Sequence, residues 1–417
     1  MKELSTLFKN RNFMHLWISQ ILSQLVVNSL SFMMLIYLFE ETGSTIATSL
    51  IWIAYALPAV LFGPIAAVAA DVFDKRKLLT VTLLIQSLTV ALFALLQGQY
   101  LYLAYGVVFA YSLANQFYIP AEAATLPLIV PKNILPFANS LFFITVQSAI
   151  AFGLLSAGAS YEYLGLGASL FLAAALLILA YTSVSLLPQI RPLERIPEDI
   201  SRGVARFFAE LVEGYQFIKS NQKIFMPFLL LIGLQVSLSV VIVTLPALAK
   251  DLIGVKPSLA GIAIGLPAAI GALTATAVVP KAIARGIKRR RVVELSLFFL
   301  SIAIVVLGSI VPNVHFWVGR TLAVACFVVA GASYVGSLIP TLTHLQITTP
   351  KDKLGRVFGN IWLITTAATV VPVIFSATIT EVFGVSLMMS LLGLVGMTTF
   401  FLLEVRKSSF IKINGGL

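Results

Sequence analysis

Charged residues are scarce in this chain. Asp, Glu, Lys and Arg together make up 11% of its 417 residues, whereas 59% of the residues are hydrophobic. Soluble domains carry about 25% charged residues. So few charges cannot cover a surface that faces water, which excludes an ordinary soluble protein. Most apolar segments must therefore face lipid.

Residues that build metal and redox sites are also few. A single cysteine, Cys326, excludes an intramolecular disulfide. The three histidines, His15, His315 and His344, are far apart, and no HExxH or CxxC spacing occurs. We therefore expect no metal and no cofactor. Because a phosphate-binding P-loop motif and clustered catalytic groups are missing too, ATP hydrolysis, an enzyme and a non-transporting receptor are the least favoured readings.

Long apolar runs dominate the sequence instead. A helix that spans a bilayer core of about 30 Å needs about 20 apolar residues. Runs of this order cover residues 13–39, 46–70, 78–98, 100–130, 137–160, 165–188, 224–249, 257–282, 292–311, 314–346, 356–380 and 384–404. They lack the period-2 alternation of a transmembrane barrel. The sequence therefore predicts an all-α membrane protein with twelve transmembrane helices.

Cationic residues concentrate in every second predicted loop. If the N-terminus lies in the cytoplasm, 25 of the 28 Lys and Arg residues fall on the cytoplasmic side, and the other three are Lys250, Lys256 and Arg320. Cytoplasmic loops are enriched in Lys and Arg. We therefore expect a multi-pass protein of the cell membrane, inner or plasma, with both termini in the cytoplasm. The net charge of +11 belongs to these loops, so no nucleic acid partner is expected.

One polar segment divides the chain. This segment covers residues 189–223, and its start is rich in proline. Apolar residues at helical spacing predict an amphipathic helix over residues 203–219 on the membrane surface. Pro131-Lys-Asn-Ile-Leu before this segment is similar to Pro350-Lys-Asp-Lys-Leu after it, and both stretches hold equivalent positions. Repeated halves are typical of secondary transporters. The predicted domains are two pseudo-symmetric six-helix bundles, 1–188 and 224–417, joined by a cytoplasmic linker, 189–223.

Several short motifs resemble one family over essentially the whole chain. Residues 70–77, Ala-Asp-Val-Phe-Asp-Lys-Arg-Lys, resemble the cytoplasmic signature loop of the major facilitator superfamily, with Val72 at the position of an arginine and Asp74 at that of a glycine. Phe117-Tyr-Ile-Pro-Ala and Ala138-Asn-Ser-Leu resemble its subgroup of macrolide-efflux-like proteins, the enterobactin exporter and lysophospholipid transporters. The resemblance implies two six-helix bundles related by a pseudo-two-fold axis along the membrane normal, and transport by alternating access.

The signature loop carries the candidate gating residues. They are Asp71, Asp74, Lys75, Arg76 and Lys77. Opposite charges at a helix junction can pair with one another or with a neighbouring helix end, so a partly buried cluster could latch the cytoplasmic face. Charges that only set the topology are the alternative.

Polar residues inside four of the predicted helices recur at a spacing of three or four. A polar side chain that faces lipid is costly, so such a stripe faces a cavity or another helix. The superfamily lines its central path with helices 1, 4, 7 and 10, and the resemblance implies the same here; hydrogen bonds that only join helices are the alternative. The candidate lining residues are Gln20, Gln24, Asn28, Tyr111, Asn115, Tyr118, Gln235, Ser239, Ser333, Ser337, Thr341 and His344.

Two charged residues lie within apolar runs. Glu122 is the candidate coupling or cation site, because protonating a carboxyl group costs less than ionising it if the site is dry. A hydrated, idle carboxylate at the membrane edge is the alternative. Arg320 could pair with a carboxylate, bind an anionic group or extend to the membrane surface. So few cavity charges disfavour sugar phosphates and peptides as substrates.

Together these features predict a monomeric secondary transporter in membrane lipid. We expect it to export amphipathic or apolar small molecules, of the drug or macrolide type, with protons as the coupling ion. Transport of a lysophospholipid or another lipid is the alternative within the same class of function.

Overall fold

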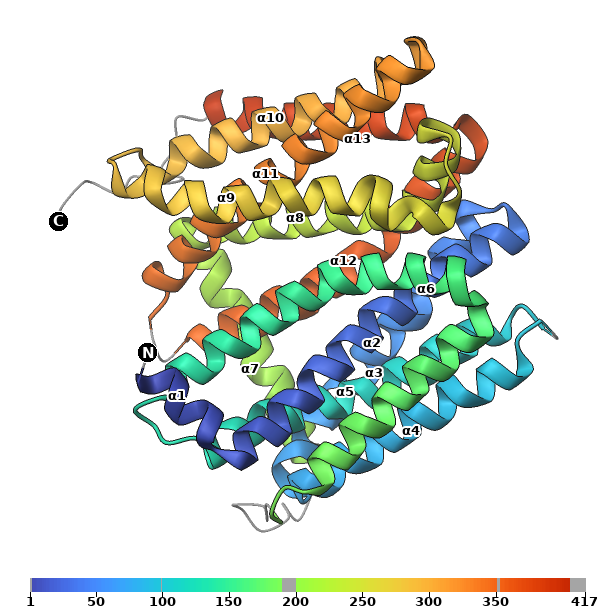
Figure 1. Cartoon of the computed structure of the whole chain (residues 1–417). Helices are drawn as coiled ribbons and strands as arrows, with labels where there is room; N and C mark the ends of the chain where they lie inside the picture. The colour runs from blue at the N-terminus through green and yellow to red at the C-terminus, as the bar shows by residue number, and fades with distance from the viewer. Residues whose placement is uncertain (1, 99, 190–199, 351–352, 406–417) are drawn as a thin grey trace. The chain divides into compact units, whose positions relative to one another are not determined.

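The computed structural model of the chain describes all residues except 1, 99, 190–199, 351–352 and 406–417. The first part of the predicted linker and the C-terminal tail therefore lie outside the described residues. Every regular element within the described part is a helix (Figure 1). The chain forms two compact units, one of residues 1–42 and 50–208 and the other of residues 43–49 and 209–417.

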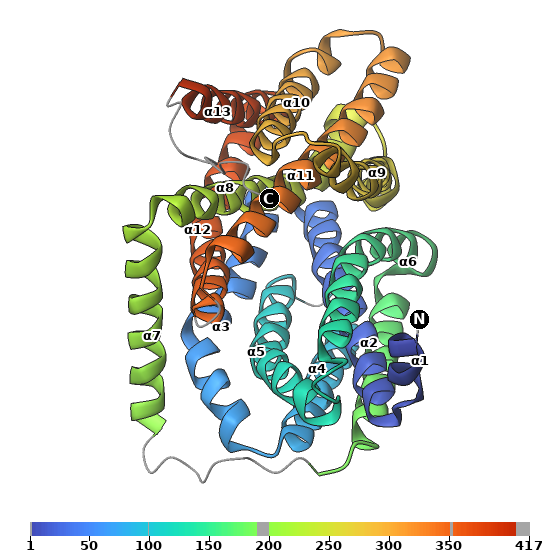
Figure 2. The same ribbon diagram turned by 90° about the vertical axis from the view of Figure 1, so that its left-hand side faces the viewer.

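The first unit is built on three main helix contacts, two of which join α6 to distant parts of the sequence. In it α2 packs against α6, and α4 packs against both α5 and α6 (Figure 2). Its helices are α1 (Lys2–Lys9), α2 (Arg11–Thr42), α3 (Thr45–Val72), α4 (Lys75–Leu96), α5 (Leu103–Ile129) and α6 (Leu135–Ser185), with the first turn of α3 grouped in the second unit.

The long helix α6 contains two predicted spans. It has 51 residues, and at Gly165 the backbone leaves the helical conformation with φ 78° and ψ 168°. Glycine adopts a positive φ without the steric cost that a Cβ would bring. The ribbon changes direction within α6 (Figure 1), so the runs at 137–160 and 165–188 form two separate spans joined at this glycine.

The second unit has α11 at its centre. This helix packs against α8, α9 and α10, while α10 also packs against α13 and α8 against α12. The long helices are α8 (Gln222–Ala247), α9 (Leu266–Ala284), α10 (Arg289–Ser309), α11 (Phe316–Thr348), α12 (Leu354–Phe383) and α13 (Val385–Val405). Short π and 3-10 helices lie between them: η1 (Leu248–Ile253), η2 (Pro257–Leu259), η3 (Gly261–Gly265) and η4 (Val311–Asn313). Helix α7 (Ile200–Ser220) covers the residues 203–219 for which the sequence predicts a helix, and the division between the two units falls after Phe208.

Membrane-spanning helices make up most of the described chain. By length and composition, ten helices among the described residues could cross a membrane. One of the ten is α6, which contains two predicted spans. Helix α5 is not among the ten, but it has 27 residues and coincides with the fourth predicted run. Helix α5 carries the polar residues Asn115 and Glu122 among its apolar ones. The prediction of an all-α fold of about twelve helices is confirmed.

Glycines let neighbouring helices approach closely in both units. A Cβ at Gly271 of α9 would lie 1.9 Å from the carbonyl oxygen of Val328 in α11, and one at Gly308 of α10 would lie 2.5 Å from the amide nitrogen of Ser390 in α13. A Cβ at Gly153 of α6 would likewise lie 2.5 Å from the Cβ of Asn28 in α2. Helices in lipid associate through such close contacts of small residues.

Candidate functional site

A buried hydrogen-bonded chain joins α2 and α5 in the first unit. The Tyr118 hydroxyl donates to Oε1 of Glu122 at 3.0 Å, and it lies 2.9 Å from the Ser19 hydroxyl. All three side chains are buried, and Glu122 is only 6% exposed. Because a tyrosine hydroxyl has one hydrogen, which Glu122 receives, the Ser19 hydroxyl donates to Tyr118. The chain therefore ends on a carboxylate.

The helical spacing of α5 explains the position of this carboxylate. Tyr111, Asn115, Tyr118 and Glu122 are three or four residues apart, which places them on one face, and all four are buried. The Asn115 side-chain oxygen accepts a hydrogen bond of 3.5 Å from Gln86 of α4. Among the described residues, Glu122 has its hydrogen bond with Tyr118 and no salt bridge. A lone carboxyl group thus lies inside the helix packing.

The predicted stripe of α2 makes one hydrogen bond within its own helix and one to a neighbouring helix. The Asn28 amide donates to the backbone oxygen of Gln24 at 2.7 Å, so its own helix satisfies it. The Gln20 amide nitrogen reaches the backbone oxygen of Phe142 in α6 at 3.4 Å. Ser29, which the sequence does not single out, contacts the Ser156 hydroxyl at 2.8 Å. Hydrogen bonds that join helices are thus present in this stripe.

The predicted stripes of the second unit meet between α8 and α11. Tyr334 of α11 donates to the side-chain oxygen of Gln235 in α8 at 3.1 Å. At one end, Nε2 of His344 lies 3.0 Å from the backbone oxygen of Lys223. Thr341 donates to the Ser337 backbone oxygen at 2.6 Å. Gln235 is exposed, whereas the other predicted members of these stripes are buried: Ser239, Ser333, Ser337, Thr341 and His344.

Three of the predicted lining residues hold buried polar atoms without a partner in the described part of the chain. They are the Gln20 side-chain oxygen, the Tyr111 hydroxyl and the Ser337 hydroxyl. A buried polar atom without a hydrogen bond costs about 1–3 kcal/mol. These atoms are therefore the members of the stripes best able to accept or donate a new hydrogen bond.

The signature loop is a tight junction within the first unit. Helix α3 ends at Val72, and the Asp74 carboxylate caps α4 by accepting from the Lys77 amide at 3.0 Å. The Arg76 guanidinium donates to the backbone oxygen of Ser185 at the end of α6. Lys75 is buried, whereas Asp71 and Lys77 are exposed. The five predicted residues thus have different local surroundings.

Arg320 binds backbone oxygens near the start of α11. Its Nε donates to Ile253 at 2.9 Å and its Nη2 donates to Gly254 at 2.8 Å. The guanidinium carbon also lies 4.1 Å from the centre of the Phe316 ring. Arginine suits such a site because its planar fork donates several hydrogen bonds at once. Arg320 therefore holds the turn after η1.

One carboxylate with a clear structural contact is missing from the sequence prediction. Oε2 of Glu381 in α12 accepts from the Ser44 hydroxyl at 2.6 Å and from the Ile46 amide at 2.9 Å, both inside the second unit. It thereby caps the free amides at the start of α3. The Gly43-Ser44 pair indicates a helix start, but no local signal points to a partner more than 300 residues away.

The sequence is similar to a known protein family and to individual transporters. Residues 16–372 match the model of the Major Facilitator Superfamily. The MFS-type transporter YfiS of Bacillus subtilis (strain 168) is 26% identical over 399 residues, which cover 91% of this chain and 90% of that protein. Macrolide efflux protein A of Streptococcus pyogenes is 29% identical over 126 residues, 29% of this chain and 31% of that one.

Solved structures of transporters have the same fold. The nucleoside transporter NupG superposes with a TM-score of 0.72 at 15% identity over 95% of this chain and 99% of that one. A POT family transporter in complex with 5-aminolevulinic acid gives 0.74 at 12% identity, over 94% of this chain and 95% of that one. At these identities the likeness shows the fold alone. With the family model matching most of its length, the chain belongs to the major facilitator superfamily and is a multi-pass secondary transporter of small molecules.

Proposed function

We propose that this protein, acting as a monomer, exports amphipathic or apolar small molecules by alternating access in exchange for protons. The chain of Ser19, Tyr118 and Glu122 carries the proposal. Ionisable groups inside membrane spans are rare, and carboxyl groups linked by hydrogen bonds are typical of proton relays. Glu122 is the coupling carboxyl group in this proposal, and Tyr118 positions it.

The character of the predicted lining residues supports an amphipathic substrate. Apart from His344 they carry amide and hydroxyl groups, and Glu122 is the one carboxyl group beside them. A strongly hydrated substrate would need several charged groups to replace its water. Similarity to macrolide efflux protein A over 126 residues points to the same class of substrate.

The distribution of Lys and Arg supports an orientation with both termini in the cytoplasm. In this orientation the signature loop faces the cytoplasm.

Asp71 is exposed at the end of α3, so its carboxylate is available to a partner at another stage of the transport cycle. We expect Asp71→Asn to lower transport without lowering insertion into the membrane. Asp74→Asn is the matched control, because asparagine caps a helix about as well as aspartate. Unchanged transport by Asp71→Asn would rule out a gating role for the Asp71 carboxylate.

Proteoliposomes with an imposed pH gradient test the coupling. We expect a cationic dye to move against its own gradient only when protons flow the other way. A fluorescent lysolipid serves as the second probe, and its transport in place of the dye would favour the lipid alternative. Dye movement that ignores the pH gradient would overturn proton antiport.

Substitution of Glu122 identifies the coupling group. Glu122→Gln keeps the side chain's shape and its bond to Tyr118 but cannot release a proton, so we expect dye exchange to persist and pH-driven accumulation to disappear. Glu381→Gln is the control, because it changes a carboxylate that caps a helix. If pH-driven accumulation survives in Glu122→Gln, the coupling group lies elsewhere.

A further inference from the structure

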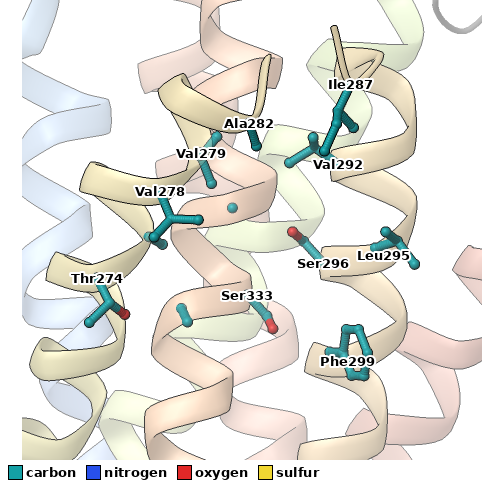
Figure 3. Close-up of a pocket in the computed structure, with 13 residues that line it drawn as sticks. Thr274, Val278, Val279, Ala282, Ile287, Val292, Leu295, Ser296, Phe299 and Ser333 are labelled. Atoms are coloured by element: carbon teal, nitrogen blue, oxygen red, sulfur yellow. The ribbon is translucent and has the colours of Figure 1, made fainter. Parts of the chain in front are cut away.

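A groove with a volume of about 340 Å³ lies between α9, α10 and α11 of the second unit (Figure 3). Val278 of α9 forms one wall, and Leu295 and Phe299 of α10 form the other. Ser333 of α11 lies on its floor, and Ile287 lies at one end (Figure 3). Gly336 of α11 lines the groove as well. The groove follows α9 from Thr274 to Ala282, a length of about 12 Å at 1.5 Å per residue.

Small residues on the floor keep the groove open, and its walls are apolar. A Cβ at Gly336 would lie 2.4 Å from the Ser296 hydroxyl, so a larger residue there would have to displace that side chain. The wall side chains remain accessible: Val278 is 60% exposed and Phe299 is 48% exposed. One leaflet of the bilayer core is roughly 15 Å deep. The apolar groove is therefore long enough to hold most of one acyl chain.

Positive charge gathers at the end of the groove that Ile287 closes. Residues 281–291 hold six Lys and Arg residues, whereas Glu294 is the only acidic residue in α9, α10 and α11. The Glu294 carboxylate forms a salt bridge with Arg290 and lies 3.9 Å from the Arg291 guanidinium. Arg285 and Lys288 flank Ile287 and are exposed. The cations therefore far outnumber the one carboxylate near them.

We propose that this groove binds an anionic phospholipid. One acyl chain lies between the walls of α9 and α10, and Arg285 and Lys288 bind the headgroup phosphate. Basic pockets between membrane helices bind such headgroups, and each Lys or Arg near the surface contributes about 1 kcal/mol. A zwitterionic lipid offers the same chains but no net charge, so the cationic end selects for the anionic headgroup.

Native mass spectrometry of the purified protein tests the headgroup site. The protein is titrated with phosphatidylglycerol and with phosphatidylcholine of the same acyl chains. We expect tighter binding of phosphatidylglycerol, which falls about 25-fold in the double variant Arg285→Gln, Lys288→Gln, since each lost cation is worth about fivefold. The control is Lys132→Gln, Lys219→Gln, which removes two exposed cations elsewhere. Equal binding of the two lipids, or an equal loss in the control, would overturn the proposal.

Filling the groove tests the acyl-chain site independently. Val278→Trp and Leu295→Trp narrow it from opposite walls, so at least one variant should fold, as judged by a single size-exclusion peak. We expect each folded variant to bind phosphatidylglycerol at least tenfold more weakly. Leu273→Trp is the control because Leu273 is an exposed residue of α9 outside the groove. Unchanged binding in both groove variants would show that the lipid lies elsewhere.

Discussion

The contact between α9 and α11 allows a stability prediction for Gly271→Ala. The added Cβ would lie 1.9 Å from the carbonyl oxygen of Val328, whereas ordinary contacts begin at 3.4 Å. The two helices must therefore separate locally by about 1.5 Å, because a backbone carbonyl in a helix cannot rotate away. Overpacking of this kind costs about 1–3 kcal/mol. Alanine regains about 1 kcal/mol of helix propensity.

A matched glycine isolates the packing cost. Gly233 lies in α8, and a Cβ there would meet nothing within 4 Å. Both substitutions gain the same helix propensity, so the difference between them is the overpacking alone. In thermal unfolding in one detergent we expect Gly271→Ala to melt about 1–3 °C below Gly233→Ala, since unfolding a chain of this length changes the entropy by about 0.9 kcal/mol per kelvin. Melting at the same temperature would refute the close contact.

Three further predictions concern single contacts and the topology. Arg320→Lys should lower the melting temperature, because an ammonium cannot replace the two bonds to the turn after η1, each worth about 1.5–3 kcal/mol; a melting temperature equal to that of the wild type would contradict this role. Glu381→Ala should cost about 1 kcal/mol through loss of the α3 cap, and Glu381→Gln, which can still accept a bond, should cost less. In a Cys326→Ala background, a membrane-impermeant thiol reagent added to intact cells should label Lys256→Cys but not Lys132→Cys; the reverse pattern would invert the proposed orientation.

The sequence predicts the helices well because hydrophobic length is a local property. The runs at 137–160 and 165–188 appear in the structure as one 51-residue helix with a turn at Gly165. Their separation was predictable, since both runs are long enough to span a bilayer. The π-helices around 248–265 were not, because the apolar pattern is the same whether a turn holds four residues or five.

Contacts between distant residues are what the sequence could not predict. The spacing of Tyr118 and Glu122 in α5 places them on one face, but Ser19 joins them from a helix 99 residues away. For Arg320 the sequence leaves several partners open, and the structure shows two backbone oxygens. Every residue carries a backbone oxygen, so no pattern of side chains marks the two that Arg320 binds.

The hydrogen bonds of the predicted lining residues separate two roles that their spacing alone leaves mixed. Asn28 and Thr341 bond to their own helices, so their polarity is satisfied locally and neither needs a substrate. The Tyr111 and Ser337 hydroxyls are buried without a partner among the described residues. A buried hydroxyl without a hydrogen bond destabilises the folded state. An apolar residue of similar size would remove that cost. Retaining the hydroxyl is therefore explained most directly by contact with a passing substrate, which makes Tyr111→Phe and Ser337→Ala the variants whose transport should change while their stability holds or rises.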